Sequence, residues 1–487
     1  MFKRLLLVLA LAAYALPLCA QSAKAPQVIV IEGRREASDA SISRKSMIYF
    51  PFDVPEGVTS IELRDEFKHQ AREGERLSLD HAYFDPRGHE FPGRGWRGNP
   101  SPGAVTLLTG DHATTTPRLV PGPIPPGRWQ LMQWLRDCPK SGVTYKYTIT
   151  LSFDGPAPPR EMPEPPPYDP GVLNPRSGWY PGELHSHTIY SDGVKSLEEL
   201  VARAKEQGLS FLVNTDHNAF RAQYDFAAVG RKYPDILVIP GMEWTTLTGH
   251  ANIIGPRMGE WFNYWVDPGD GNLPKVIDSV HTSGALFSIN HYYAACWGCE
   301  WKFPEPDWQA ADALEVWNGK WGGSDARALE VWDGLVRSGR HINAFGGTDY
   351  HRGDGLWGPT AWVYARNLSH EALMEGLRKG RVFLSANIKA PKIFLSIHGT
   401  NAFPGDTVAP EMDGSLSVEV RVLRGKGMTL RLIWPESEVK LPVERDYAVF
   451  SHTVRTGTLK PSWVRTEIIL PDGRMAALTN PIYVRTP

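Results

Sequence analysis

The chain has 487 residues, of which 42% are hydrophobic and 22% are charged. This composition is typical of a globular protein rather than a disordered one, and the length suits roughly two to four domains. The formal net charge of −2 gives no electrostatic reason to expect nucleic acid or an anionic membrane as a partner.

The N-terminus predicts an export signal. A basic start precedes an apolar run over residues 5–18, and small residues follow, with cleavage expected after Ala20. Residues 1–20 are therefore predicted to be a secretory signal peptide, because the run is short for a permanent span. Lipid attachment at Cys19 is the alternative, but Leu18 fits a lipoprotein cleavage site poorly. No other stretch is apolar enough to span a membrane, so we expect the mature chain to be periplasmic or secreted.

Three cysteines remain after this cleavage. In an oxidising compartment, the sequence CWGC predicts a local disulfide between Cys296 and Cys299 that staples a loop. A zinc knuckle would need a second ligand pair nearby, and the chain has no other CxxC. Cys138 is then expected to be an unpaired, buried thiol.

The outer parts of the chain have the pattern of β-sandwiches. Residues 26–154 consist of short alternating apolar runs separated by Gly- and Pro-rich turns. Eight prolines between Pro156 and Pro170 then indicate a stiff, extended linker, which we place at residues 155–177. The alternating runs return over residues 390–487 and predict a second β-sandwich.

Between the two sandwiches, residues 178–389 alternate apolar strand candidates with helical segments. One helix is marked by Ser196 as its N-cap, Glu199 three residues later and Gly208 as its stop. Such alternation implies a parallel sheet, either open or closed into a barrel. In both forms, ligands bind at the carboxyl ends of the strands.

Imidazole and carboxylate side chains recur where these predicted strands end. His185 and His187 are two residues apart, so on a strand they point to the same side and can reach one ion. The other candidates follow in chain order: Asp192, Asp216, His217, Glu243, His250, His291, Glu315, Asp349 and His351. Because parallel strands end at one edge, this repetition predicts a metal centre. His281 and His341, which lie in or after helices, are expected to be structural.

The ligand types indicate the metal and the chemistry. Mixed imidazole and carboxylate ligands suit Zn²⁺, Mn²⁺ or Fe²⁺ better than Ca²⁺ or Mg²⁺, so we expect divalent transition-metal ions. A carboxylate shared by two cations holds them about 3.5–4 Å apart, and a water bound between them becomes a nucleophile near neutral pH. No serine or cysteine nucleophile is needed, and the chain has no GxSxG motif.

The motifs HSH…SDG, TDHN, GxE, NH and GTDYH resemble those of the PHP (polymerase and histidinol phosphatase) superfamily. The secreted layout and the CxxC after the NH pair resemble its carbaryl-hydrolase-type branch. The resemblance covers roughly residues 178–390. It implies a multi-domain α/β plus all-β protein, in which a distorted (β/α)7 barrel is flanked by the two β-sandwiches.

The resemblance also implies two to three divalent transition-metal ions and assigns their ligands. The first ion would be bound by His185, His187, Glu243 and Asp349. Glu243 would bridge to a second ion, bound by His250 and His291. A third ion would be bound by Asp192, His217 and His351. Tyr292 stands where the family usually has proline, which puts the substrate contacts of that loop in question.

Neighbouring residues are expected to support these ligands. Asp216 and Asn218 flank His217 and would orient a ligand. For Glu315 two interpretations stay open, since it either supports a ligand or is an ordinary carboxylate at a strand end.

Phosphoester hydrolysis is the leading functional hypothesis. The substrate would be a small-molecule or glycan-linked phosphoester, with Asp349 and His217 as catalytic residues. Arg352 and Lys320 would bind its phosphate oxygens. Two further candidates for this clamp are Arg257 and Arg327.

Two other functions are considered. One is hydrolysis of a carbamate, ester or amide, and the other is a carbohydrate-binding envelope protein with an inactive barrel. Loop tryptophans are able to stack on an aryl ring or a sugar. They are Trp244, Trp261, Trp265, Trp297, Trp301, Trp321 and Trp357. The sequence does not predict the oligomeric state.

Overall fold

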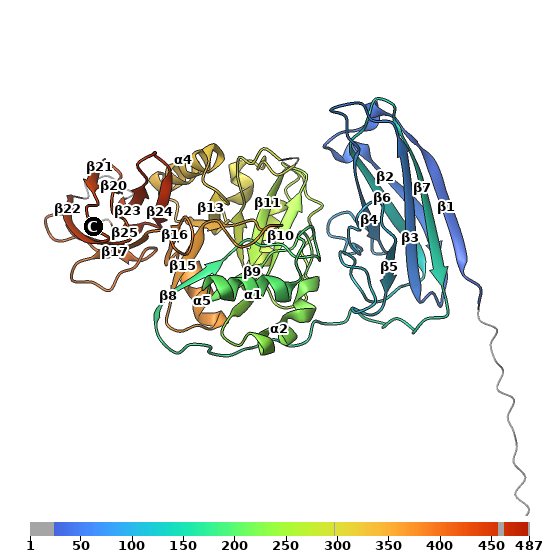
Figure 1. The fold of residues 1–487 in the computed structure, drawn as a ribbon, viewed down its shortest axis with the longest axis horizontal. Helices are drawn as coiled ribbons and strands as arrows, with labels where there is room; N and C mark the ends of the chain where they lie inside the picture. The colour runs from blue at the N-terminus through green and yellow to red at the C-terminus, as the bar shows by residue number, and fades with distance from the viewer. Residues whose placement is uncertain (1–23, 297, 456–461, 486–487) are drawn as a thin grey trace, which may run out of the picture.

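The computed structural model describes residues 24–296, 298–455 and 462–485. The predicted signal peptide (residues 1–20) and Trp297 lie outside the described residues. In Figure 1 the N-terminal strands form one body, and the chain then runs under the central α/β part to enter it at β8. Among the described helices, none is long and apolar enough to cross a membrane.

The N-terminal strands form two antiparallel sheets, β1-β7-β3-β5 and β2-β6-β4. Alternate side chains of both sheets, such as Leu131 on β6 and Ile149 on β7, point into a shared core. The strands are β1 (Gln27–Arg35), β2 (Met47–Val54), β3 (Ser60–His69), β4 (Ser78–Phe84), β5 (Thr106–Thr109), β6 (Gly127–Asp137) and β7 (Val143–Ser152). Two short 3-10 helices, η1 (Ala37–Asp39) and η2 (Arg44–Ser46), precede β2. The result is the sandwich that the alternating sequence predicts.

The central part is a curled sheet covered by helices (Figure 1). Its strands are β8 (Gly178–Glu183), β9 (Phe211–Asn214), β10 (Leu237–Thr246), β11 (Gly249–Ile254), β12 (Leu286–Ile289), β13 (Ala313–Asn318) and β14 (Asn343–Gly347). The connecting helices are α1 (Leu197–Gln207), η3 (Arg221–Asp225), α2 (Phe226–Lys232), α3 (Leu273–Thr282), η4 (Glu305–Trp308) and α4 (Gly323–Arg337). The pairs β8–β9, β9–β10, β12–β13 and β13–β14 are parallel, as the alternation of strands and helices predicts.

Helix α1 begins and ends where the sequence predicts. The side chain of Ser196 accepts a hydrogen bond from the amide of Glu199, and the Glu199 carboxylate accepts one from the Ser196 amide. The helix stops at Gly208, whose φ of 84° lies in the left-handed region that favours glycine. Leu200 and Val201 are buried on its inner face. This helix connects the first two strands that carry candidate ligands.

Strand–helix alternation is interrupted in the middle of the sheet. Strands β10 and β11 form an antiparallel hairpin, because the two residues between them leave no room for a helical crossover. Strand β11 is also antiparallel to β12. Strand β14 ends the sheet, whereas β8 pairs with β9 and β15, so β8 and β14 form no ladder with each other. A parallel bridge between Ser186 and Tyr350 joins the chain beyond their ends. The sheet is therefore joined only at the end where the histidines lie.

The same sheet continues into the C-terminal part of the chain. Beyond β8 it adds β15 (Thr360–Ala365) and β16 (Val382–Ser385), connected by α5 (His370–Arg378), and then β24 (Met475–Thr479), β23 (Ser462–Ile469), β20 (Thr429–Trp434) and β21 (Ser437–Pro442). Strands β18 (Thr407–Val408) and β25 (Ile482–Val484) extend β23. A second sheet of β17 (Lys392–Ile397), β19 (Ser415–Leu423) and β22 (Tyr447–Arg455) shares a core with these strands. Hydrogen bonding therefore crosses the boundary expected at residues 389–390, through the pair β16–β24.

Candidate metal centre

The nine side chains predicted as metal ligands lie together at the carboxyl-end side of the curled sheet. They form four overlapping groups, and in each group one ligand atom per residue lies within 4.8 Å of the others. The groups are His185–His187–Asp349, His185–Glu243–His291, His217–Glu243–His250 and His187–Asp192–His217–His351. The structure thus brings side chains from six strands or the loops that follow them to one place.

Glu243 lies at the centre of these groups. Its Oε1 is 3.1 Å from Nε2 of His291 and 3.2 Å from Nδ1 of His250. Its Oε2 is 2.7 Å from Nδ1 of His217. A single buried carboxylate thus faces imidazoles on both sides, which is the arrangement that a ligand shared by two cations needs.

His185 and His187 both reach the same carboxylate. Oδ1 of Asp349 is 3.1 Å from Nε2 of His187 and 3.3 Å from Nε2 of His185. Since alternate residues of an extended segment point the same way, the H-x-H spacing produces this convergence.

His187 also takes part in a group to which the resemblance does not assign it. Its ring stacks on that of His351, with centroids 4.1 Å apart, and lies 4.5 Å from that of His217. Oδ1 of Asp192 is 3.1 Å from Nε2 of His351 and 3.5 Å from Nε2 of His217. His187 therefore lies between the first and third implied metal sites.

Buried atoms that make close contacts but no hydrogen bond indicate that a cation fits this centre. Among the described residues, His185 Nε2, Asp192 Oδ1 and Glu243 Oε2 are buried and form no hydrogen bond with the oppositely charged groups beside them. Such atoms are costly unless something satisfies them, and a divalent ion does so. Nitrogen and carboxylate oxygen donors together suit transition metals.

The electrostatics of the centre also favour a cation. Burial opposes ionisation of Glu243, but the imidazoles of His217 and His185 outweigh it and hold the pKa of this carboxyl well below its usual range. Burial likewise opposes ionisation of Asp349, and the neighbouring His185 and His187 hold its pKa well below the ordinary value. Both carboxylates are therefore anionic at neutral pH.

Backbone strain is concentrated at the same place. Asn218, His291 and Asp349 have φ values of 50°, 27° and 51°, in the left-handed region that non-glycine residues rarely adopt. Such conformations persist only where the surrounding structure enforces them, and they are often found at functional sites.

Glu315 supports a ligand, which decides between its two interpretations. Its Oε1 is 2.9 Å from Nδ1 of His185. Its Oε2 accepts hydrogen bonds from the amide of His291 at 2.9 Å and from Nδ2 of Asn318 at 3.0 Å. Glu315 thus fixes the orientation of one ligand and the backbone of another.

Two further residues of the site are not among the sequence predictions. Glu183 accepts hydrogen bonds from the amides of His185 and Thr348, at 2.9 and 2.8 Å, and burial raises the pKa of Glu183 to about 7. Asn290 donates from Nδ2 to Oε1 of Glu243 at 2.9 Å. Both are neighbours of recognised motifs, in GELHSH and INHYY, and this adjacency is the one sequence signal that points to them.

Asp216 and Asn218 position backbone and loops rather than a ligand ring. Asp216 accepts hydrogen bonds from the amide and hydroxyl of Thr188, at 2.7 and 2.6 Å, and from the hydroxyl of Ser191 at 2.6 Å. It thereby shapes the loop that carries Asp192. Asn218 exchanges two hydrogen bonds of 2.9 Å with the backbone of Thr245. Asp216 thus acts on a ligand through the loop that carries it, and Asn218 acts on the backbone of Thr245.

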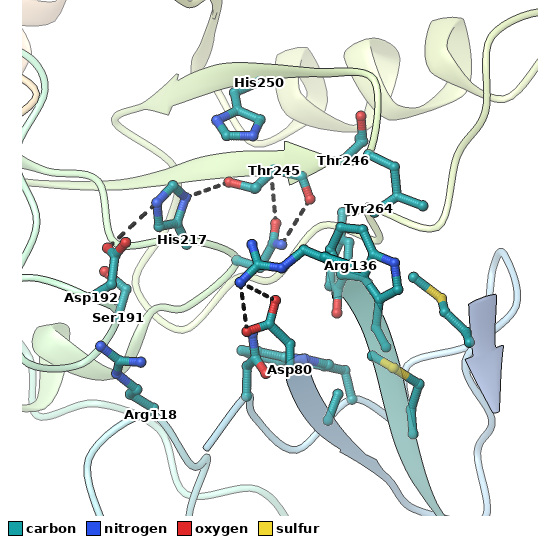
Figure 2. A pocket seen from close by; sticks show the side chains of 18 of the residues that line it. Asp80, Arg118, Arg136, Ser191, Asp192, His217, Thr245, Thr246, His250 and Tyr264 are labelled. Carbon is teal, nitrogen blue, oxygen red and sulfur yellow. Dashed lines mark hydrogen bonds and ion pairs between the residues drawn. The ribbon is translucent and has the colours of Figure 1, made fainter. Parts of the chain in front are cut away.

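A cavity of about 600 Å³ opens beside the metal centre (Figure 2). Three predicted ligands line it: Asp192, His217 and His250. The other side of the cavity is lined by the N-terminal sandwich, including Asp80, Arg118 and Arg136.

The basic residues expected to bind phosphate do not line this cavity. Arg352 and Lys320 are both exposed and are absent from its lining, because they follow the strand ends into loops that face solvent. Arg257 forms an ion pair with Glu260. Arg327 lies over the ring of Tyr293, 3.8 Å from its centroid. The cavity takes its arginines from the sandwich instead.

Few of the loop tryptophans reach the cavity. Among those that the structure describes, Trp265 lines it, whereas Trp244 and Trp301 are buried in the core. Trp357 is exposed. Trp297 lies outside the described residues. Most of the described set therefore contributes to packing rather than to the cavity.

The cysteines and the two histidines expected to be structural lie as expected. Cys296 and Cys299 form a disulfide with a Cα–Cα distance of 5.3 Å, and Cys138 is a free, buried thiol. His281 pairs with Asp312 at 2.9 Å near the surface. His341 stacks on Tyr483, with ring centroids 3.7 Å apart.

Comparison with known proteins identifies part of the chain. The PHP domain family model matches residues 183–300. This segment contains seven of the nine predicted ligands, all except Asp349 and His351. A search of curated proteins finds no match.

Three solved structures show low similarity. A two-domain protein from Bacteroides vulgatus containing a predicted PHP-like metal-dependent phosphoesterase is 15% identical, with 65% of this chain and 99% of that chain covered and a TM-score of 0.37. A putative metal-dependent phosphoesterase from Bifidobacterium adolescentis is 15% identical, with 40% and 95% covered and a TM-score of 0.29. An amidohydrolase from Chromobacterium violaceum with bound sulfate and no metal is 15% identical, with 35% and 87% covered and a TM-score of 0.27. Scores this low carry no argument about the present chain.

The PHP match and the gathered ligands together support a metal-dependent hydrolase. The matched segment supplies Glu243 and six further predicted ligands of the centre.

Proposed function

We propose that this protein is an exported metal-dependent phosphoesterase, periplasmic or secreted, with two or three Zn²⁺, Mn²⁺ or Fe²⁺ ions held by the nine ligands. In this proposal, the central part of the chain is a distorted (β/α)7 barrel. The observation that carries it is the set of overlapping ligand groups around Glu243. When bound, the ions would acidify a water molecule and neutralise charge on phosphoryl oxygens.

The chain's own residues position the reacting groups. Glu315 and Thr245 contact Nδ1 of His185 and of His217, respectively, and so fix the orientation of these rings. Of the four catalytic candidates, His217 lines the cavity and so faces a substrate that enters there. Asp349 reaches both histidines of the H-x-H pair.

One observation favours the alternative of a carbamate, ester or amide hydrolase of the carbaryl-hydrolase type. Aromatic side chains line the cavity and could stack on an aryl group: Trp96, Trp134, Tyr264 and Trp265. The other alternative, a carbohydrate-binding protein with an inactive barrel, has less support because all nine ligand positions hold competent residue types.

Metal analysis and a substrate panel test the proposal. Protein purified without chelators should contain about two or more equivalents of transition metal. It should hydrolyse p-nitrophenyl phosphate or bis-p-nitrophenyl phosphate faster than aryl carbamates, with Zn²⁺, Mn²⁺ and Fe²⁺ supplied separately. Turnover of aryl carbamates without turnover of the phosphate esters would favour the carbamate, ester or amide hydrolase. Fewer than about two equivalents and no turnover would favour the binding protein.

A pair of histidine variants provides the matched control. His187→Ala removes a ligand shared by two groups and should lower kcat/KM at least about 100-fold. His281→Ala, at a histidine near the surface, should retain the activity of the parent protein. Equal activity in both variants would refute the assignment of the centre.

A further inference from the structure

The cavity beside the metal centre is shared between two parts of the chain. The barrel side supplies predicted ligands, and the sandwich side supplies side chains from β4, β6 and the loop before β6 (Figure 2). The charged groups on the sandwich side are Arg44, Arg76, Asp80, Arg118 and Arg136. A substrate that reaches His217 or His250 through this cavity therefore lies against the sandwich.

A buried arginine of the barrel holds the sandwich in place. Arg221, at the start of η3, is 3% exposed, and its guanidinium enters the loop that precedes β6. It donates hydrogen bonds to the carbonyls of Leu119, His112 and Thr115, at 2.8, 2.7 and 2.6 Å, and to that of Thr116. Four carbonyls bound by one buried cation fix this loop against the barrel.

Aromatic packing adds to the same contact. Phe84 of the sandwich packs edge-on against Trp265, with ring centroids 5.3 Å apart. Trp96 stacks on Trp261 at 6.0 Å. The sandwich side of the cavity, which we call its roof, is thus held against the central part by aromatic packing and hydrogen bonds.

Arg118 lies in the loop that Arg221 fixes. Its φ of 71° places the backbone in the left-handed region, and its carbonyl accepts a hydrogen bond from the amide of Asn99 at 3.0 Å. A Cβ added to Gly98 would lie 2.1 Å from that carbonyl oxygen, so this close approach requires glycine. The left-handed backbone of Arg118 and its close contact with Gly98 therefore fix the position from which the Arg118 side chain starts.

Within the described ranges, the guanidinium of Arg118 makes no hydrogen bond and no ion pair, and its charge acts on the carboxylate of Asp80 without direct contact. It is half-buried and lines the cavity, on the side of Ser191 and Asp192 in Figure 2. An unpaired guanidinium facing a metal centre is a site for the oxygens of an anion, which it can bind with two parallel hydrogen bonds.

A second polar feature, the pair Asp80–Arg136, lies on the same roof. Nη2 of Arg136 is 3.1 Å from Oδ2 of Asp80, and both side chains are about one-quarter exposed, at 28% and 23%. Nε of Arg136 is buried without a hydrogen-bond partner. The guanidinium also lies 5.3 Å from the ring centroid of Trp134. A carboxylate, free N–H donors and an aromatic ring together can bind vicinal hydroxyls and the face of a sugar.

We infer that the N-terminal sandwich completes the substrate site, with Arg118 binding the phosphoryl oxygens and Asp80–Arg136 with Trp134 binding a hydroxyl-rich alcohol. The substrate class is then a phosphate ester of a sugar or polyol. This inference rests on the proposed phosphoesterase function, and it assigns specificity to residues far in sequence from the metal ligands.

Kinetics of matched variants test the inference. Arg118→Met should raise KM for both glucose 1-phosphate and p-nitrophenyl phosphate about 10- to 100-fold, with a much smaller change in kcat. Arg118→Lys, which keeps the charge, should recover part of this loss. Arg128→Met is the control, because Arg128 pairs with Asp53 on an exposed part of the sandwich. If Arg118→Met matched the control, Arg118 would have no role in binding.

The Asp80–Arg136 pair has its own test. Arg136→Met should raise KM for glucose 1-phosphate at least about tenfold more than for p-nitrophenyl phosphate. If Arg136→Met folds poorly, the double variant Asp80→Asn with Arg136→Gln can replace it, because it leaves no unpaired carboxylate. It should likewise raise KM more for glucose 1-phosphate than for p-nitrophenyl phosphate. Equal effects on both substrates would exclude a site for the sugar hydroxyls.

Binding without turnover separates this inference from the proposed function. Inorganic phosphate and glucose 1-phosphate should each raise the thermal midpoint of the metal-loaded parent protein, and the shift should shrink in Arg118→Met but not in Arg128→Met. Such a result without hydrolysis would refute the phosphoesterase function and retain the anion site. If the protein hydrolysed phosphate esters but phosphate raised the thermal midpoint equally in the parent protein and in all variants, the proposed function would stand and the anion site at Arg118 would be overturned.

Discussion

Glu315 accepts a hydrogen bond from Nδ1 of His185 at 2.9 Å, which leaves Nε2 of this imidazole directed toward the metal centre. The same carboxylate binds the backbone amide of His291. One buried side chain on β13 therefore sets the geometry of ligands that come from two other segments.

The first prediction concerns this carboxylate. Glu315→Gln replaces an anionic acceptor by a neutral amide and should weaken binding of the metal about 10- to 100-fold, because residues that orient metal-binding imidazoles contribute on this scale. Competition with a chromogenic chelator would measure the change. Glu330→Gln, at an exposed position of α4, is the control. Indistinguishable affinities of the two variants would contradict the role of Glu315.

The second prediction concerns removal of the metal. Without a cation, the buried carboxylates of Glu243 and Asp349 lose the charge that stabilises them, so chelation should lower the thermal midpoint. Ions present at about 1,000 times their Kd contribute about 4 kcal/mol to the folded state. Calorimetry before and after treatment with dipicolinate, and after adding Zn²⁺ back, would measure this. In Glu243→Gln, chelation should lower the thermal midpoint by less than in the parent protein. If chelation left the midpoint of the parent protein unchanged, the result would argue against a metal centre.

Arg221 joins the central α/β part to the N-terminal sandwich through its hydrogen bonds to the loop before β6. Arg221→Met removes the donors to four carbonyls and should lower the free energy of unfolding by about 3 kcal/mol. Hydrogen exchange of residues 112–119 should become faster, since these residues lose their anchor. Arg203→Met, at a partly exposed arginine paired with Glu206, serves for comparison. Unchanged exchange in Arg221→Met would mean that the loop is held by other contacts.

The fourth prediction concerns the disulfide. The carbonyl of Gly298, inside the Cys296–Cys299 loop, accepts a hydrogen bond from the amide of Gly249 at 2.9 Å, and His250 follows directly. Reduction should therefore displace a ligand-bearing strand and lower kcat/KM roughly tenfold without unfolding the protein. Thiol titration would confirm the reduction and kinetics the effect.

Cys138 supplies the internal check for this experiment. Burial raises the pKa of its thiol, so it should stay unreactive toward alkylating reagents until the protein unfolds. Full activity with two titrated thiols would show that the disulfide does not support the site.

The metal centre is the part of the site that the sequence predicts best. Its ligands follow apolar runs, and parallel strands necessarily present such positions at one edge, so His185, Glu243 and Asp349 can be grouped without coordinates. The β10–β11 hairpin is missed because GMEWTTLTGHANIIG reads equally well as two separate strands.

The roof of the cavity has no comparable signal. Asp80, Arg118 and Arg136 belong to no motif and precede the first ligand by about 50 to 100 residues. Their place depends on how the sandwich docks, which is decided by a few buried contacts such as those of Arg221. Arg352 shows the opposite case, since adjacency to a ligand in sequence does not bring its side chain into the cavity.

The ladder between β16 and β24 also limits how the chain can be shortened. Residues 383–385 pair with residues 477–479, so the last strands protect an edge that belongs to the catalytic half of the molecule. A truncated chain ending near residue 389 would leave the backbone amides and carbonyls of β16 without their partners on β24. We would expect such a truncated protein to self-associate by strand addition instead of yielding a smaller working enzyme.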